Sequence, residues 1–334
     1  MTVSRAQNPI LDTPFDAAST AEEVAAGIDL TGKVAIVTGG HSGVGRETTR
    51  VLRARGAHVV VPVRDPAKAA GMLEGVDGVE IDRLDLVDPD SVDAFAARFL
   101  AGGRQLDILV TSAGIMGVPL TRDARGHEAH FATNHLGHFR LTARLAPALA
   151  AGARVVSVSA AAHRLSPVVF DDVGFEHREY QPMLGYGQSK TANILFAREL
   201  DRRGVRAFSV HPGSIVETNL SGWAAPGTLR AMKLVDEDGK PVIDPYSGKK
   251  NVPQGASTSV WCAVSPQLDG VGGVYCVDNN IAPVAGESGH DARSHGTAEI
   301  PTAGVSPHAI DPAAATRLWE LSERLTGVSF PARH

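Results

Sequence analysis

Short apolar runs rich in valine and isoleucine recur along the chain, and segments with the length and period of helices separate them. The clear runs are Val34–Val37, Val59–Val63, Leu106–Val110, Val155–Val158, Val205–Val210 and Val274–Val277, with Gly78–Leu86 as a weaker candidate. Runs of this kind are typical of strands buried on both faces, and their alternation with helices is typical of βαβ units. The pattern therefore predicts an α/β fold with a doubly wound parallel sheet of about seven strands and helices on both faces.

The alternating pattern predicts one catalytic domain over residues 31–285. Within it, residues 213–253 change character, because Gly, Pro, Asp and Lys interrupt scattered apolar residues such as Trp223 and Leu229. A long insertion of this kind in a compact fold is usually a functional loop or lid. We therefore expect residues 213–253 to form a loop over a substrate.

Two extensions flank this domain. Residues 1–30 are polar and contain one expected short helix, before which Thr20 and Glu23 have the spacing of a capping box. Residues 286–334 begin with a polar stretch rich in His and Gly and end in an expected helix near Pro312–Leu325.

Composition narrows the class of protein. The 334 residues carry 32 Lys+Arg against 37 Asp+Glu, a formal charge of −5, and contain no run of basic residues. This argues against nucleic acid or an anionic membrane as a partner. Neither a signal peptide nor the ~18 apolar residues of a membrane span are present. The two cysteines, Cys262 and Cys276, lack CxxC spacing, which favours a reducing, cytoplasmic location.

A glycine-rich turn follows the first strong strand, in the segment Lys33–Gly45. Glycine lets the backbone turn tightly and approach a pyrophosphate, which then lies at the positive end of a helix. A tight strand-to-helix turn also needs glycine, but its place in the first βαβ unit favours a Rossmann-type dinucleotide site. The residues expected around the phosphates are Gly39, His41, Ser42, Gly43, Val44 and Gly45.

The end of the second strand bears on the choice of cofactor. An NAD site places a carboxylate there for the ribose 2′-hydroxyl, whereas an NADP site places an arginine for the 2′-phosphate. Val63 stands where the acid is expected, and Arg64 follows it. Asp65 is one position further on and is free to pair with Lys68 instead. The sequence therefore favours NADP over NAD.

Tyr186 and Lys190 are four residues apart at the start of a predicted helix, which puts them on one face. A neighbouring ammonium stabilises tyrosinate and so lowers the pKa of the phenol. Such a tyrosine can act as general acid or base between an alcohol and a carbonyl. Tyr246 and Lys250 have the same spacing, but their Pro- and Gly-containing segment favours a solvated loop.

Together these motifs resemble the short-chain dehydrogenase/reductase family of the single-domain TGxxxGxG type. The subgroup that the chain most resembles contains retinol dehydrogenases, the WW-domain oxidoreductase and protochlorophyllide reductase. The similarity covers roughly residues 30–278. It includes Thr38–Gly45, Arg64, Asp85-Leu86, Ser112-Ala113-Gly114, Asn134 in Asn-His-Leu-Gly-His-Phe, Tyr186 with Lys190, and His211-Pro212-Gly213.

The resemblance implies a role for each matched residue. Asn134 would hold a water that relays protons to Lys190, and Lys190 would also hold the nicotinamide ribose. Together with Tyr186 they would form the catalytic set. The remaining matched positions would bind the cofactor: Asp85 and Leu86 at the adenine, Ser112, Ala113 and Gly114 beside the fourth strand, and Pro212, Gly213 and Ile215 at the nicotinamide.

The chain departs from the family at the substrate side of this site. Ala160 stands where the family has the serine that polarises the substrate. Strand alternation puts Ser159 on the opposite face, so it could replace that hydroxyl only if the strand end is bent or shifted. His163 is another candidate donor. The segment from Pro212 to Thr218 is one residue longer than usual, which leaves the contact of Thr218 with the cofactor amide open.

No metal site is expected. His127 and His130 flank Glu128 but lack the i,i+4 spacing of a zinc helix, so this segment is interpreted as a solvated helix face. His135 and His138 are interpreted as ordinary helix residues.

The sequence thus predicts an NADP-dependent oxidoreductase that moves a hydride between nicotinamide and a carbonyl or alcohol, with Tyr186 handling the proton. The alternative is a sensor or scaffold that binds NAD(P) and has lost most of its activity, which Ala160 favours. A nucleotide-sugar epimerase or dehydratase fits less well, because its loop has TGxxGxxG spacing. The apolar residues of the insertion favour a bulky, apolar small molecule as substrate. A homo-oligomer is compatible with the sequence.

Overall fold

The computed structural model describes residues 7–286 and 304–331, except 219, 221, 223, 225 and 226. Trp223 and most of the polar stretch before the last helix therefore lie outside the described residues. The strands are β1 (Val34–Thr38), β2 (His58–Val63), β3 (Val79–Arg83), β4 (Leu106–Thr111), β5 (Leu149–Val158), β6 (Ala207–His211), β7 (Val274–Val277) and β8 (Asn280–Ile281).

The strands form one sheet in the order β3-β2-β1-β4-β5-β6-β7-β8. All neighbours pair in parallel except β7 and β8, which are antiparallel. The predicted doubly wound parallel sheet is confirmed, and the short antiparallel strand β8 was not anticipated. Strands β1 to β3 are added toward one edge of the sheet and β4 to β7 toward the other, and the switch point between β1 and β4 is where such α/β sheets bind ligands.

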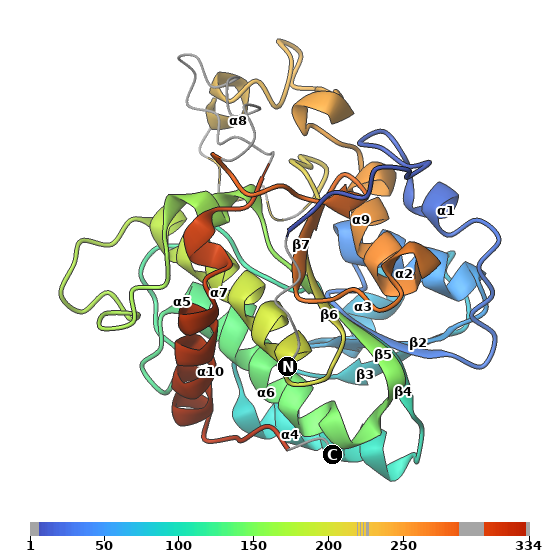
Figure 1. Ribbon diagram of the computed structural model, residues 1–334, viewed down its shortest axis with the longest axis horizontal. Helices are drawn as coiled ribbons and strands as arrows, with labels where there is room; N and C mark the ends of the chain where they lie inside the picture. Colours follow the sequence, from blue (N-terminus) through green and yellow to red (C-terminus); the bar gives the residue numbers. More distant parts are fainter. Residues whose placement is uncertain are drawn as a thin grey trace.

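Helices cover both faces of the sheet (Figure 1). The longer elements are α2 (Gly43–Ala54), α3 (Pro66–Met72), α4 (Pro89–Ala101), α6 (Gly137–Leu145), α7 (Pro182–Arg202), α9 (Val252–Val264) and α10 (Pro312–Thr326). The shorter ones are α1 (Ala21–Val24), α5 (Ala129–Phe131), a π-turn η1 (Ala132–Leu136) and α8 (Thr228–Ala231). One apolar core joins α1, α2, α3 and α9 to the sheet, and a second joins α4, α6 and α7.

Both extensions pack on this domain. The predicted capping box is present at α1, where Thr20 and Glu23 bond each other's backbone. The predicted terminal helix is α10, which packs against α7 (Figure 1). No helix in the described part of the chain is both long and apolar enough to cross a bilayer.

Candidate active site

A cavity of about 1870 Å³ opens at the carboxyl ends of the central strands. Its volume exceeds the roughly 300–1,000 Å³ of a typical small-molecule site, so it has room for a dinucleotide and a second molecule. Every residue that the sequence assigned to the cofactor lines this cavity. These residues are Gly39, His41, Ser42, Gly43, Val44, Gly45, Arg64, Asp85, Leu86, Ser112, Ala113, Gly114, Tyr186, Lys190, Pro212, Gly213 and Ile215.

The phosphate loop needs its glycines because other backbone lies very close. Gly39 has φ +68°, and a Cβ there would lie 2.9 Å from the Cα of Ala113. A Cβ on Gly45 would lie 2.3 Å from the carbonyl oxygen of Gly39. The loop therefore packs tightly between β4 and the first turn of α2, and the positive end of α2 faces the cavity.

Basic groups gather where β2 ends. His41, Arg64 and Lys68 all line the cavity. Within the described residues, neither the Arg64 guanidinium nor the Lys68 ammonium has a partner, and Nδ1 of His41 is buried without one. Burial and the charges of Arg64 and Lys68 lower the pKa of His41. Asp65 accepts a hydrogen bond from the backbone N–H of Lys68 and so caps α3.

Tyr186 and Lys190 lie on one face of α7, as the spacing predicted. Both are almost fully buried, and the Lys190 Nζ lies 5.4 Å from the centre of the Tyr186 ring. Nζ also donates to the carbonyl oxygen of Val158 over 2.9 Å. Burial raises the pKa of Tyr186 and lowers that of Lys190 to about 7. The expected fall in the phenol pKa is therefore wrong for this structure, because burial disfavours the charged tyrosinate.

Asn134 lies in the π-turn η1, behind the cavity wall. Its side chain bonds the N–H and the carbonyl of Ile115, and its Nδ2 donates to Ser189 Oγ over 2.9 Å. Its own carbonyl accepts from His138 Nδ1 over 3.0 Å. The amide thus fixes the loop after β4 to α7, while its water-holding role stays a prediction.

Neither candidate donor near Ala160 is free. The Ser159 hydroxyl donates to the carbonyl of Lys190 over 2.7 Å. His163 Nδ1 donates to the carbonyl of Ala160, and its Nε2 accepts from the N–H of Ser306. The structure therefore offers no side-chain replacement for the missing hydroxyl from these two residues.

The second Tyr–Lys pair is separated. Tyr246 is 71% exposed and bonds Asp16, whereas the Lys250 side chain is fully buried and forms an ion pair of 2.6 Å with Asp278. The expectation of a solvated loop was thus right for Tyr246 and wrong for Lys250. The residues around Lys250 in the sequence do not reveal its partner, because Asp278 comes from the end of β7.

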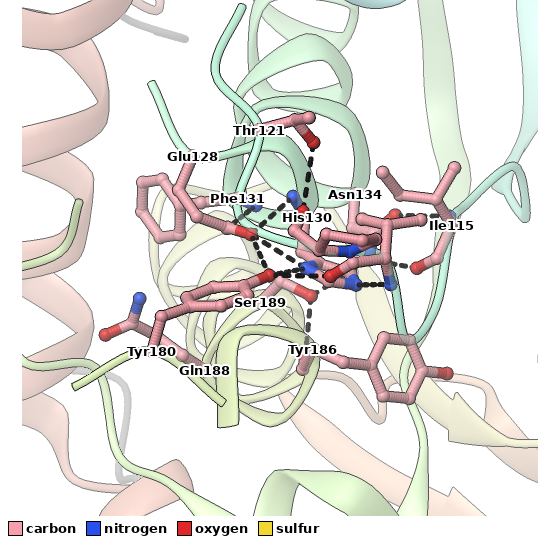
Figure 2. A network of polar contacts seen from close by, with 12 residues as sticks. Ile115, Thr121, Glu128, His130, Phe131, Asn134, Tyr180, Tyr186, Gln188 and Ser189 are labelled. Atoms are coloured by element: carbon pink, nitrogen blue, oxygen red, sulfur yellow. Dashed lines mark hydrogen bonds and ion pairs between the residues drawn. The ribbon is translucent and has the colours of Figure 1, made fainter. Parts of the chain in front are cut away.

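The segment Glu128–His130 is also not a solvated helix face. The side chains of Glu128 and His130 are fully buried, and His130 Nδ1 lies 2.7 Å from Glu128 Oε1. Figure 2 shows them in a polar network with Tyr180, beside the helix that carries Tyr186. The interpretation failed because burial of this segment depends on residues distant in the chain, such as Tyr180, which cover it.

Sequence reasoning missed part of the cavity wall. Met183 on α7 and the loop after β4 contribute apolar side chains, and α3 contributes Lys68 and Met72. Their only local signal was their position after a strand end or at a helix start. The insertion, by contrast, was singled out, and it lines the cavity with Leu220, Gly222, Leu229, Met232, Leu234, Tyr246, Ser247 and Lys249.

Comparison with known proteins agrees with this geometry. Residues 33–225 match the family model described as short chain dehydrogenase. The chain belongs to the short-chain dehydrogenase/reductase family. It is an oxidoreductase of that family, whose members bind a nicotinamide cofactor and act on small molecules.

Relatives span nearly the whole chain. A "Probable oxidoreductase" of Streptomyces lividans is 42% identical over 88% of this chain and 97% of its own. Retinol dehydrogenase 12 of Homo sapiens is 35% identical over 91% of this chain and 89% of its own. The WW domain-containing oxidoreductase of Danio rerio is 35% identical over 93% of this chain and 72% of its own. The subgroup that the motifs resemble is thus confirmed.

Solved structures share the fold. A protein from Mycobacterium paratuberculosis aligns with a TM-score of 0.68 and 31% identity, covering 92% of this chain and 98% of that one. A short chain dehydrogenase from Burkholderia cenocepacia in complex with NADP aligns with a TM-score of 0.57 at 22% identity, over 74% of this chain and 96% of that one. The second likeness concerns the fold alone.

Proposed function

We propose that the protein is an NADP-dependent dehydrogenase/reductase in which Tyr186 exchanges a proton with the substrate oxygen. The observation that carries this proposal is the meeting of Tyr186, Lys190 and the phosphate loop in one cavity. The loop and the adjacent β4 residues would hold the cofactor, and Lys190 would contact its ribose. NADPH, when bound, supplies a hydride from the nicotinamide ring.

Proton transfer is the part of the reaction that belongs to this chain's own side chains. In reduction, the substrate carbon gains a hydride and its oxygen gains the proton of the Tyr186 phenol, so a carbonyl becomes an alcohol. The raised pKa of the phenol keeps Tyr186 in its protonated form. A charged Lys190 ammonium beside it would stabilise the tyrosinate that remains, and reprotonation from water restores the phenol.

The unpaired basic groups support NADP over NAD. The dianionic 2′-phosphate would find Arg64, Lys68 and His41 around it, and hydrogen bonds between charged groups are stronger than neutral ones. The carboxylate that could hold the 2′-hydroxyl of NAD, Asp65, already caps α3. We expect Arg64→Ala to weaken NADPH binding and to leave NADH binding nearly unchanged. Equal losses for both cofactors, measured by fluorescence titration, would contradict this assignment.

Turnover tests the catalytic role directly. NADPH oxidation is followed by absorbance with a panel of aromatic and long-chain aliphatic aldehydes and ketones. Tyr186→Phe should abolish turnover and keep NADPH affinity, because it removes the proton donor and little else. Tyr246→Phe is the matched control, since that exposed tyrosine should be silent. If Tyr246 proved essential and Tyr186 dispensable, the proposal would be wrong.

A catalytically weak NAD(P)-binding sensor or scaffold is the second candidate, and Ala160 is the observation that favours it. It predicts tight NADPH binding with no turnover on the whole panel. The apolar lining from the insertion, including Leu229, Met232 and Leu234, supports a bulky apolar substrate if the protein turns over. Light scattering of the purified protein tests whether it forms the homo-oligomer that the sequence allows.

A further inference from the structure

A buried carboxylate, Glu128, lies beside the turn of α7 that carries the proposed proton donor Tyr186. The Glu128 side chain is fully buried and accepts hydrogen bonds from three residues. Its Oε1 receives the N–H of His130 at 3.0 Å and its Nδ1 at 2.7 Å, and its Oε2 receives the N–H of Phe131 at 2.8 Å. The Tyr180 hydroxyl lies 3.1 Å from Oε1. Burial alone would raise the pKa of Glu128, but the hydrogen bonds from His130 and Phe131 lower it, so the group stays ionised.

The cluster of Glu128, His130 and Tyr180 also bonds to a loop that lines the cavity. His130 Nε2 accepts from the N–H of Val118 over 3.4 Å, which leaves the proton on Nδ1 for Glu128. The Tyr180 hydroxyl also lies 3.0 Å from the carbonyl of Val118. Val118 belongs to the loop after β4 that lines the cavity. The cluster therefore connects the loop after β4, the start of α5 and the segment that precedes α7.

The cluster also presses on the turn of α7 that carries Tyr186. A Cβ on Gly185 would lie 3.0 Å from the Tyr180 ring and 3.2 Å from Glu128 Oε1, so Tyr180 and Glu128 lie close against the backbone of this turn. The His130 ring meets the Tyr186 ring edge-on, with centres 6.0 Å apart. In Figure 2 the Tyr186 phenol points away from the network, while the backbone of its turn lies beside it.

A second anchor acts on the same residue. Ser189 Oγ donates to the carbonyl of Tyr186 over 2.7 Å and accepts from Asn134. Glu128 caps α5 and Asn134 lies in η1, so this short segment approaches the Tyr186 turn at Gly185 and again, through Ser189, at the carbonyl of Tyr186. The charged side chain nearest to this cluster is Arg178. Its guanidinium stacks on the Phe175 ring and interacts with Glu128 only through the electrostatic attraction of their charges.

We propose that Glu128, held by His130 and Tyr180, is a positioning residue that sets how far the Tyr186 hydroxyl reaches into the cavity. This inference rests on the proposed role of Tyr186 as proton donor. An ionised carboxylate suits this position because three N–H groups converge on it, and the Tyr180 hydroxyl, which it shares with the Val118 carbonyl, lies beside them. A neutral amide has one acceptor oxygen, and its N–H₂ would face a donor, so the turn of α7 would have to move.

The test uses Glu128→Gln, with Asp311→Asn as its matched control. Asp311 caps α10 by accepting the N–H of Ala314 over 2.7 Å, so the same carboxylate-to-amide change is made at a cap far from the cavity. Fluorine NMR of cofactor-free protein carrying fluorotyrosine reports the Tyr186 ring, and Tyr186→Phe assigns its signal. Turnover is measured with the best aldehyde or ketone of the panel, and NADPH affinity by fluorescence.

Glu128→Gln should shift or split the Tyr186 signal and lower kcat by about tenfold or more, while the Kd for NADPH stays within about twofold. Asp311→Asn should change neither. An unmoved Tyr186 signal, or a fall in kcat that matches the loss of folded protein, overturns the proposal. If Glu128→Gln does not fold, Tyr180→Phe decides, with a smaller change of the same kind expected. If the wild-type protein turns over nothing, the proposed function fails, and the NMR signal still decides the positioning role.

Discussion

At the scale of single residues, burial gives the proposed catalytic pair unusual protonation states. Tyr186 is held neutral and Lys190 is close to half-protonated near neutrality, since its pKa is about 7. A cofactor that brings phosphate charge into the cavity would favour the charged ammonium. We therefore expect Lys190 to take up a proton more readily when NADPH binds.

Ala160 carries the prediction with the largest effect on rate. A hydroxyl there would donate to the substrate oxygen as negative charge develops, and one such donor is worth on the order of 10²–10³ in rate. Because Ser159 and His163 have their hydrogen bonds elsewhere, Ala160→Ser should raise kcat by about tenfold or more, with little change in NADPH affinity. Ser159→Ala is the control, and a large loss of kcat in that variant would mean that Ser159 moves to polarise the substrate.

The lowered pKa of Lys190 leads us to predict that the stability of the folded protein depends on pH. Between pH 7 and the ordinary pKa of lysine, about 10.4, the unfolded chain holds a proton that the folded chain has released, so stability rises with pH across that window. Lys190→Met should therefore raise the Tm of the cofactor-free protein at about pH 6 and give a smaller gain at about pH 10. Lys240→Met, at an exposed lysine, should show no such trend. Thermal melts across the pH range measure both variants.

At the scale of elements, a buried ion pair between Lys250 and Asp278 fixes the C-terminal end of the insertion, residues 213–253. Lys250 donates its backbone N–H to Ser214, and its stem packs against Gly213 at the entrance of the same segment. Its ammonium pairs with Asp278, whose φ of +53° puts it in the left-handed region. The pair thus closes residues 213–253 into a loop beside the proposed nicotinamide site.

Asp278→Asn tests this closure, because asparagine suits the left-handed backbone and only the charge is lost. It leaves the Lys250 ammonium buried without a counter-charge, at a cost of up to about 3 kcal/mol. We expect faster tryptic cleavage within residues 213–253 and a raised KM for the carbonyl substrate. Asp238→Asn, within the exposed part of the insertion, is the control. Unchanged cleavage would show that the insertion is held by other contacts.

At the scale of the whole molecule, α10 completes the second core. The Trp319 ring is 1% exposed, stacks on Phe196 and meets the edges of Phe139 and Phe330. Trp319→Ala should lower the free energy of unfolding by about 3–5 kcal/mol, because it empties a close-packed site. Urea unfolding measures the change. Leu11→Ala, at a residue that is 92% exposed, should stay within about 0.5 kcal/mol of wild type.

The sequence alone determined the periodic features of this protein. The valine-rich runs predicted the parallel sheet, and the strand order then brought the glycine loop, Arg64, Tyr186 and Lys190 to one cavity. These features are local: a strand, a tight turn or an i,i+4 pair is set by neighbours in the chain. The antiparallel strand β8, of two residues, is too short to leave a periodic signal.

Only the tertiary structure decided the electrostatics. Burial reversed the expected pKa shift of Tyr186, and it placed Glu128 and Lys250 inside the protein, where the sequence had indicated solvent. Their partners Tyr180 and Asp278 come from other elements, beyond the reach of a local pattern. A charge in the interior is stable only with partners that satisfy it, and those partners are fixed by how the elements pack.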